Sequence, residues 1–207
     1  MTVKTKAHLG LLVTNLFFAI NLSAVKFLTG NNFIKPFGLN VIRVGISVVL
    51  FWLLFLFKPV KENISRKDIP RLALCALTGI AINQLLFLKG LSLTYSIHAV
   101  LLMLTTPILI TIIAAWLLKE RVNIYTVTGL AFGVGGAVLL IASGKNSGTG
   151  NDVFMGDILF LINAISYTFY FILVKPLMSK YNPVQLIRWV FTLGFFMVLP
   201  FGFKNWT

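Results

Sequence analysis

The sequence predicts an all-α polytopic membrane protein, built as a bundle of helices that cross a bilayer. Hydrophobic residues make up 58% of the 207 residues and charged residues only 11%, whereas soluble domains carry about 25% charged residues. The mean hydropathy is +0.93. The apolar residues also lie in long runs of roughly 20 residues, the length that a helix needs to cross about 30 Å of hydrocarbon. A soluble fold could not cover this much apolar surface.

We expect one membrane-spanning helix from each of seven apolar runs. These cover residues 7–28, 37–57, 72–91, 97–118, 122–143, 157–177 and 184–203. The runs do not alternate apolar with polar residues, as strands of a membrane β-barrel would. Hydrocarbon offers the backbone no hydrogen-bond partner, so each run must be helical. The first run lacks a clear small-x-small cleavage site, and we interpret it as a retained helix rather than a signal peptide.

The basic residues lie mostly between the runs. There are 18 Lys+Arg against 5 Asp+Glu, a net charge of +13. Because they form no single patch, the lipid bilayer is the expected partner and nucleic acid is not. Placing the N-terminus in the cytoplasm puts eleven basic residues on the cytoplasmic side and five outside, as the positive-inside rule favours. We therefore expect a bacterial plasma (inner) membrane protein with a cytoplasmic N-terminus. A single cysteine, Cys75, excludes a disulfide framework.

A flexible polar linker at residues 144–156 predicts a boundary between two units. The units would cover residues 1–143, with five helices, and 157–207, with two. Lys26 near the end of the first run and Arg43 early in the second are matched by Lys175 and Arg188 in the sixth and seventh runs. Five helices separate the copies, so the second copy would be inverted in the membrane. The alternative is two unrelated hydrophobic hairpins.

A family resemblance is most specific over residues 89–140. This stretch contains Lys89–Gly90–Leu91, Thr94–Tyr95–Ser96–Ile97–His98–Ala99, Leu104–Thr105–Thr106–Pro107, Glu120–Arg121, and then Gly129, Gly133 and Gly136. A helix with a central Thr-Pro that ends in Glu-Arg, followed by a glycine-rich helix, resembles the EamA family of the drug/metabolite transporter superfamily. The resemblance covers essentially the whole chain.

This resemblance implies ten helices in two inverted five-helix units that move small metabolites across a membrane. The sequence departs from that plan because it stops at Thr207, after two helices of the second unit. We infer a second unit truncated after two helices, with about three helices missing. A true seven-helix protein is the alternative.

Polar side chains within the apolar runs are the candidates for a substrate path, which the first, third, fourth and sixth runs would line. They are Asn15, Asn83, Gln84, His98, Thr105, Thr106, Asn163, Ser166, Tyr167 and Tyr170. The last four are spaced i, i+3, i+4 and i+7, so they share one helix face. Such a stripe forms either a cavity wall or a set of interhelical hydrogen bonds. The sequence leaves these two interpretations evenly balanced.

The other path candidates differ in depth. Asn15 lies deep and shares a face with Lys26, which we interpret as a snorkelling anchor. Asn83 and Gln84 point about 100° apart, so only one of them should face the path directly. His98, near a helix end, is expected to be hydrogen-bonded at the interface. A proton-coupled step through its imidazole is the alternative.

Structural or gating roles are expected for Arg43, Pro107, Glu120, Arg121 and Arg188. Pro107 should kink its helix, because it lacks an amide hydrogen and crowds the preceding turn. An arginine within the membrane must snorkel or find a partner. We identify no carboxylate inside the runs, so its partners would be carbonyls, water or an anionic group of a substrate. Gly129 and Gly133 form a Gly-xxx-Gly motif that permits close helix packing.

These features predict a secondary transporter of small metabolites, specifically an exporter of amino acids or related compounds that works by alternating access. No Walker loop, HExxH, CxxC or catalytic triad is present in the sequence, so we expect no enzyme activity, no cofactor and no metal. A non-transporting membrane scaffold or assembly protein is the alternative. The substrate is a small molecule that the sequence does not identify, and homo-oligomerisation is left open.

Overall fold

The computed structural model describes residues 3–57, 64–103, 105–118, 123–143 and 152–203, and within these ranges every regular element is a helix. The prediction of an all-α membrane bundle is confirmed. Six segments are long and apolar enough to cross a membrane, namely Ala7–Gly30, Pro36–Phe57, Arg66–Leu93, Ser96–Ala115, Val153–Met178 and Pro183–Gly202. They correspond to six of the seven predicted runs.

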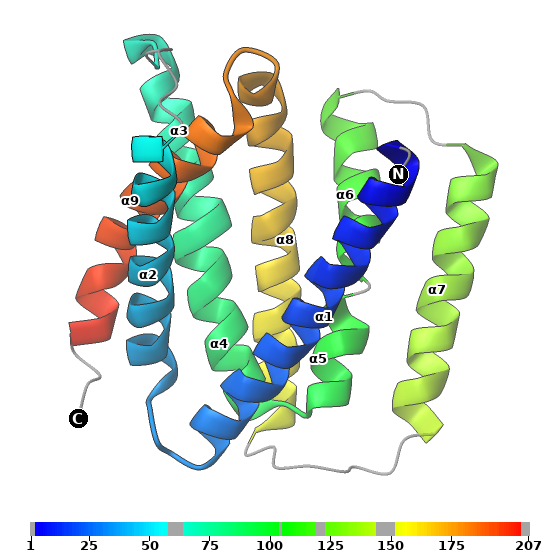
Figure 1. Cartoon of the computed structure of the whole chain (residues 1–207). Coiled ribbons are helices and arrows are strands. Elements are labelled where there is room, and N and C mark those ends of the chain that lie inside the picture. The colour runs from blue at the N-terminus through cyan, green and yellow to red at the C-terminus, as the bar shows by residue number, and fades with distance from the viewer. Residues whose placement is uncertain (1–2, 58–63, 104, 119–122, 144–151, 204–207) are drawn as a thin grey trace.

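The helices lie side by side along much of their length (Figure 1). Their bounds are α1 Val3–Gly30, α2 Pro36–Phe57, η1 Arg66–Asp68, α3 Ile69–Ala76, η2 Leu77–Ile82, α4 Asn83–Leu93, α5 Ser96–Met103, α6 Thr105–Leu118, α7 Ile124–Ser143, α8 Val153–Met178 and α9 Pro183–Phe203. The fifth predicted run forms α7. The fourth contains α5 and α6, which lie on either side of residue 104, itself outside the described residues.

The third predicted run is one continuous span, η1–α3–η2–α4, with a π-helical turn in its middle. The π turn covers Leu77–Ile82. Such turns interrupt the regular pairing of carbonyls with amides and are frequent at functional sites. The hydropathy of the run gives no sign of this turn, so the sequence predicted an uninterrupted helix.

Helix α8 begins four residues earlier than predicted, inside the proposed linker. The Asp152 side chain accepts a hydrogen bond of 3.1 Å from the Met155 amide and so caps the helix. An aspartate at this position satisfies one of the free amides in the first turn of a helix. The hydropathy signal starts only after this capped turn.

Two buried apolar cores hold the described helices together. The first joins α2, the third span, α8 and α9, and is centred on Val44, Cys75, Ile80, Leu186 and Val190. The second joins α1, α2, α4, α5 and α8 through Leu22, Val25, Leu39, Leu88, Leu91, Ala99 and Phe160. Helix α4 packs along α8, and α2 packs along α9.

Glycines set the closest helix approaches, but they are not the glycines that the sequence indicated. A Cβ at Gly194 of α9 would lie 2.5 Å from the Ile80 side chain, and one at Gly156 of α8 would lie 2.8 Å from Thr94. A Cβ at Gly129 or Gly133 of α7 would meet nothing within 4 Å among the described residues. The expected close packing at the Gly-xxx-Gly motif is therefore not made within the described part of the chain.

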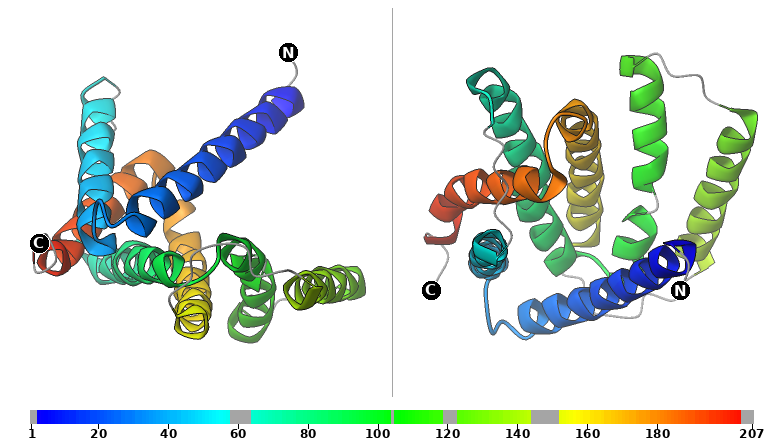
Figure 2. Two further views of the ribbon diagram at one scale, coloured as in Figure 1. Left: turned by 90° about the horizontal axis from the view of Figure 1, so that it is seen from below. Right: turned by 45° about the horizontal axis from the view of Figure 1, so that its top comes forward.

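Helix α1 runs obliquely across the bundle and diverges from α2 (Figures 1 and 2). Near its C-terminal end Leu22, Val25 and Thr29 are buried, whereas every residue from Ala7 to Ile20 is exposed. Only this C-terminal end is packed, against α4 in particular.

Candidate functional site

The polar stripe on α8 lies against the π turn. Asn163 and Ser166 are each 7% exposed. Asn163 Nδ2 donates to the Asn83 carbonyl at 2.6 Å, and Ser166 Oγ donates to the Thr78 carbonyl at 2.7 Å. The two side chains thus supply donors to carbonyls within and just after the interrupted turn. This geometry is that of interhelical hydrogen bonds, one of the two interpretations that the sequence left open.

The two tyrosines of the stripe are partly buried and lie ring to ring. The Tyr167 and Tyr170 rings are nearly parallel, with centroids 5.8 Å apart. Tyr170 packs on Gly79 of the π turn, where a Cβ would lie 2.5 Å from the ring. The absence of a side chain at Gly79 therefore makes room for Tyr170.

Gln84 and Asn15 lie away from the α8 stripe. Gln84 is one turn from Leu88 on the α4 face that meets α1 and α2 in the second core. Asn83 lies on the adjacent face with Phe87, whose ring contacts Phe160 of α8. Asn15 is exposed, and its Nδ2 donates to the Leu11 carbonyl of its own helix at 2.9 Å. Neither Gln84 nor Asn15 is hydrogen-bonded to the α8 stripe among the described residues.

The candidates on the fourth run are only partly described. The backbone of Thr105 begins α6, Thr106 is half-buried, and Pro107 is exposed with its carbonyl accepting a hydrogen bond from Thr111. Glu120 and Arg121 lie outside the described residues, as does the Thr105 side chain.

A partly buried polar cluster, formed by Lys26, Thr94, His98 and Asp157, joins α1, the end of α4, α5 and α8. Asp157 of α8 accepts a hydrogen bond from the Thr94 hydroxyl and lies 3.0 Å from His98 Nδ1 of α5. Lys26 of α1 donates to the Leu91 and Thr94 carbonyls at 2.9 and 2.6 Å. Gly156 allows α8 to come close enough to Thr94 for these contacts. The cluster closes the end of the bundle where α1 is packed.

The cluster corrects one sequence expectation. We found no carboxylate inside the runs, yet Asp157 is the first residue of the sixth run and lies in the second turn of α8. It stands at the edge of that run, directly after the predicted linker at residues 144–156. A better signal was available, because an acid beside an apolar run and a histidine at the end of another are natural partners inside a membrane.

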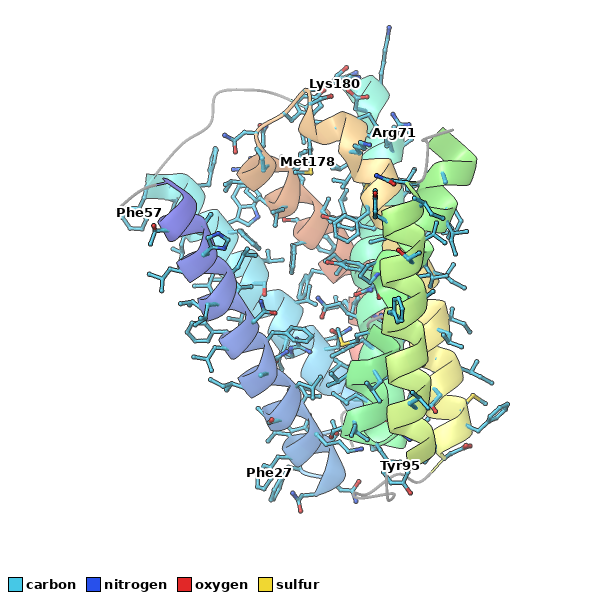
Figure 3. All side chains as sticks on the ribbon, turned by 90° about the vertical axis from the view of Figure 1, so that its right-hand side faces the viewer. Phe27, Phe57, Arg71, Tyr95, Met178 and Lys180 are labelled. Carbon is cyan, nitrogen blue, oxygen red and sulfur yellow. The ribbon has the colours of Figure 1, made fainter. Side chains whose placement is uncertain are left out.

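A second polar cluster, Asp68, Lys180 and Tyr181, lies at the opposite end. The Tyr181 hydroxyl donates to Asp68 Oδ2 at 2.8 Å, and Lys180 Nζ lies 3.3 Å from Oδ1. Figure 3 shows Lys180 at one end of the bundle and Tyr95, the neighbour of Thr94, at the other. The two clusters therefore tie the third span to α8 and to the residues that directly follow it, at both ends of the span.

The arginines of α2 and α9 have different surroundings. Arg188 is 5% exposed, and its guanidinium carbon lies 3.7 Å from the centroid of Phe55 and 4.7 Å from that of Trp52. Cation–π attraction stabilises a charge in this position. Arg43 is half-buried and has no such ring contact among the described residues. Its Nη1 atom is buried without a hydrogen-bond partner there, and so are both amide atoms of Asn40, one turn earlier.

The exposure of the residues on α1 and α2 differs between the two ends of this side of the bundle. Leu39 of α2 is buried, but Leu50 and Leu54, on nearly the same helix face, are 55% and 54% exposed. The exposed half of α1 lies at the same end. Among the described residues, α1 and α2 are thus packed near Lys26 and exposed toward the N-terminal end of α1.

Comparison with known proteins agrees with this architecture. The model of the EamA-like transporter family matches residues 5–142. The uncharacterized transporter YetK of Bacillus subtilis is 29% identical over 158 residues, covering 75% of this chain and 48% of the relative. An uncharacterized transporter of Archaeoglobus fulgidus is 26% identical over 98% of this chain and 70% of its own length. The chain thus spans about half of the Bacillus relative.

Two further similarities bear on fold and on function. A probable terminal-alkyne amino-acid exporter of Streptantibioticus cattleyicolor is 25% identical over 134 residues, covering 65% of this chain and 44% of that protein. One solved crystal structure of a protein superposes with a TM-score of 0.59 at 17% identity, and the match covers 87% of this chain and 65% of that one. At this identity the similarity supports the fold alone. From the family match and the helical membrane architecture together, the chain belongs to the EamA-like transporter family.

Proposed function

We propose that this chain works as part of a secondary transporter that exports amino acids or related small metabolites by alternating access. Family membership supports a membrane transporter. The similarity to a protein named as a probable amino-acid exporter supports the substrate class. Placing the N-terminus in the cytoplasm of a bacterium, and dividing the chain into two inverted units at residues 144–156, belong to the same proposal.

The single observation that carries the proposal is the one-sided packing of α1. Lys26, Leu22 and Val25 close one end of this side of the bundle, and the exposed half of α1 leaves the other end open. With a cytoplasmic N-terminus, the open end faces the cytoplasm, as an exporter needs when it loads its substrate. Alternating access would then require α1 to release its contacts at the Lys26 end.

The substrate path in this proposal runs beside α1, lined by Asn15, Gln84 and Thr106. Tyr167 and Tyr170 offer ring surface at the π turn, next to Asn83, Asn163 and Ser166, which support it. Pro107 and the Glu120–Arg121 pair would shape and gate the path from the fourth run. His98 belongs to the closed end, where its contact with Asp157 would open during the cycle.

The test is flux through the complete transporter reconstituted in liposomes. Counterflow of radiolabelled amino acids is measured for the wild type, for Asn15→Ala with Gln84→Ala, and for Asn31→Ala as a matched control. Asn31 is an exposed amide just beyond α1. We expect the double variant to lose most of the counterflow and the control to keep it. Absence of counterflow for every amino acid would refute the proposed substrate class.

A scaffold function without transport is the second candidate, because Asn163 and Ser166 act as interhelical donors. It predicts no solvent access beside α1, so a cysteine placed at Asn15 would not react with a water-soluble maleimide.

A further inference from the structure

The side of α2 next to α1 carries Arg43, whose charge has no counter-ion among the described residues. Arg43 is the eighth residue of α2, so it lies about 10 Å along the helix from its start. A charged side chain at this depth is unfavourable unless it reaches water or a partner. Its Nη1 atom is buried and makes no hydrogen bond within the described residues.

The described carboxylates are all engaged elsewhere. Asp68 binds Tyr181 and Lys180 at one end of the bundle. Asp157 binds Thr94 and His98 at the other. Asp152 caps α8. Within the part of the chain that the structure describes, no acidic residue is left to neutralise Arg43.

Arg188 is the comparison for Arg43, because aromatic rings surround its guanidinium group. The centroids of the Trp52, Phe55 and Trp189 rings lie 3.7 to 5.7 Å from its guanidinium carbon. Its Nε and Nη1 atoms, like Nη1 of Arg43, make no hydrogen bond within the described residues, so the aromatic rings are what distinguishes it. Trp52 is itself fixed by a hydrogen bond from its Nε1 to the Thr192 hydroxyl at 3.1 Å. Arg43 has no comparable aromatic surroundings among the described residues. Its charge is therefore available to a ligand.

The neighbours of Arg43 complete a small polar site. Arg43 is one turn from Leu39, which packs with Leu88 of α4 in the second core. Gln84 is one turn from Leu88, and this turn leads toward the same end of the bundle as the turn from Leu39 to Arg43. Arg43 and Gln84 therefore both lie just beyond the second core. Asn40, on the turn of α2 before Arg43, is fully buried with both amide atoms unpartnered among the described residues.

The unpartnered atoms differ in kind, and this difference selects the ligand. Buried polar groups are normally hydrogen-bonded, so exceptions indicate a missing partner. Arg43 Nη1 is a cationic donor that suits a carboxylate. Asn40 Oδ1 is a neutral acceptor that suits an ammonium group, and Asn40 Nδ2 is a second donor that suits the carboxylate. An inorganic anion such as phosphate would leave that acceptor unused.

We propose that Arg43, with Asn40 and Gln84, forms the subsite that binds the charged end of a zwitterionic amino acid. Arg43 binds the carboxylate, and the amide oxygens of Asn40 and Gln84 accept from the ammonium group. This inference rests on the proposed transport function and adds to it the residues that determine which substrate binds. The variable side chain of the substrate then points toward the exposed half of α1.

The test is ligand-induced thermal stabilisation of the complete transporter, purified in detergent. The probes are the twenty amino acids, the carboxamide of each one that stabilises, and inorganic phosphate. For the wild type we expect at least one amino acid to raise Tm, with its carboxamide and phosphate having far weaker effects. For Arg43→Gln we expect the apparent affinity to fall roughly 10- to 100-fold, the loss of one charge-assisted hydrogen bond.

Further variants keep the test independent of folding. Arg43→Lys retains the charge and should bind with intermediate affinity, while Gln84→Leu should weaken binding without touching the charge. Lys35→Gln removes an exposed charge just before α2 and should bind as the wild type does. Each variant is compared with the wild type by size-exclusion elution, and the binding of Arg43→Gln to acid and carboxamide should be equal.

The proposal is overturned if no amino acid stabilises the wild type. It is also overturned if the carboxamide binds as tightly as the acid, if phosphate binds best, or if Arg43→Gln binds like the wild type. The counterflow assay separates this failure from that of the proposed function. Counterflow of amino acids with unaltered kinetics in Arg43→Gln would leave transport standing and remove Arg43 from the site.

Discussion

Replacing Asp157 by alanine is expected to loosen α8 from α4 and α5. The Asp157 carboxylate accepts from the Thr94 hydroxyl and pairs with His98 Nδ1 at 3.0 Å. Thr94 is fully buried, and the side chains of His98 and Asp157 are 12% and 28% exposed. The alanine variant would therefore leave two largely buried polar groups without their partner.

The size of the effect follows from these contacts. Hydrogen bonds to charged groups contribute about 1.5–3 kcal/mol in soluble proteins, whereas interhelical hydrogen bonds in membranes average about 0.6 kcal/mol, with a maximum near 1.7. Because two contacts are lost and Asp157 is partly exposed, we expect a destabilisation of about 1–3 kcal/mol. Asp157→Asn keeps an acceptor for Thr94 and should lose less.

The assay is reversible unfolding of the purified protein in mixed micelles with increasing SDS. A double-mutant cycle with Thr94→Val isolates the pairwise contribution, expected at about 0.6–1.7 kcal/mol. Additive effects of the two substitutions, with a coupling energy indistinguishable from zero, would refute the view that this contact holds α8 in place.

Two other predictions follow from the packing. Gly194→Ala should destabilise the protein by about 1–3 kcal/mol, because its Cβ would lie 2.5 Å from Ile80, whereas Gly129→Ala, with nothing within 4 Å, should be neutral or stabilising in the same SDS unfolding assay. Equal effects would contradict the described packing. In membranes, Asn15→Cys should react with a water-soluble maleimide and Asn163→Cys should not, since Asn15 is exposed and Asn163 is buried between α8 and the third span. Labelling of neither would favour the scaffold function.

Much of the fold could be predicted from the chain, but the elements that shape the site could not. The π turn at Leu77–Ile82 has an ordinary apolar sequence. Asn163 and Ser166, 80 and 88 residues away from their partners in the chain, donate to carbonyls just after the turn and within it. A stripe of polar residues on α8 indicated a special face, yet its spacing is the same for a cavity wall and for a helix contact. A role for these residues in transport stays a prediction.

Asp157 and Arg43 are two further residues whose surroundings the sequence did not predict. Asp157 is the first residue of the sixth predicted run, and its cluster with Thr94 and His98 emerges only when α5 and α8 are brought together. Arg43 looked like the counterpart of Arg188 in a repeat. Among the described residues, both have buried guanidinium nitrogens without a hydrogen-bond partner, but aromatic rings surround only Arg188.

The sequence by itself determined that the chain is a helical membrane protein, where most of its spans lie, and which family it resembles. These properties depend on local composition, because each run of about 20 apolar residues forms a membrane-spanning helix largely independently of the other runs. Only the tertiary structure decided which polar side chains find partners in other helices and which stay available. That outcome depends on the register and approach of neighbouring helices, which no single segment encodes.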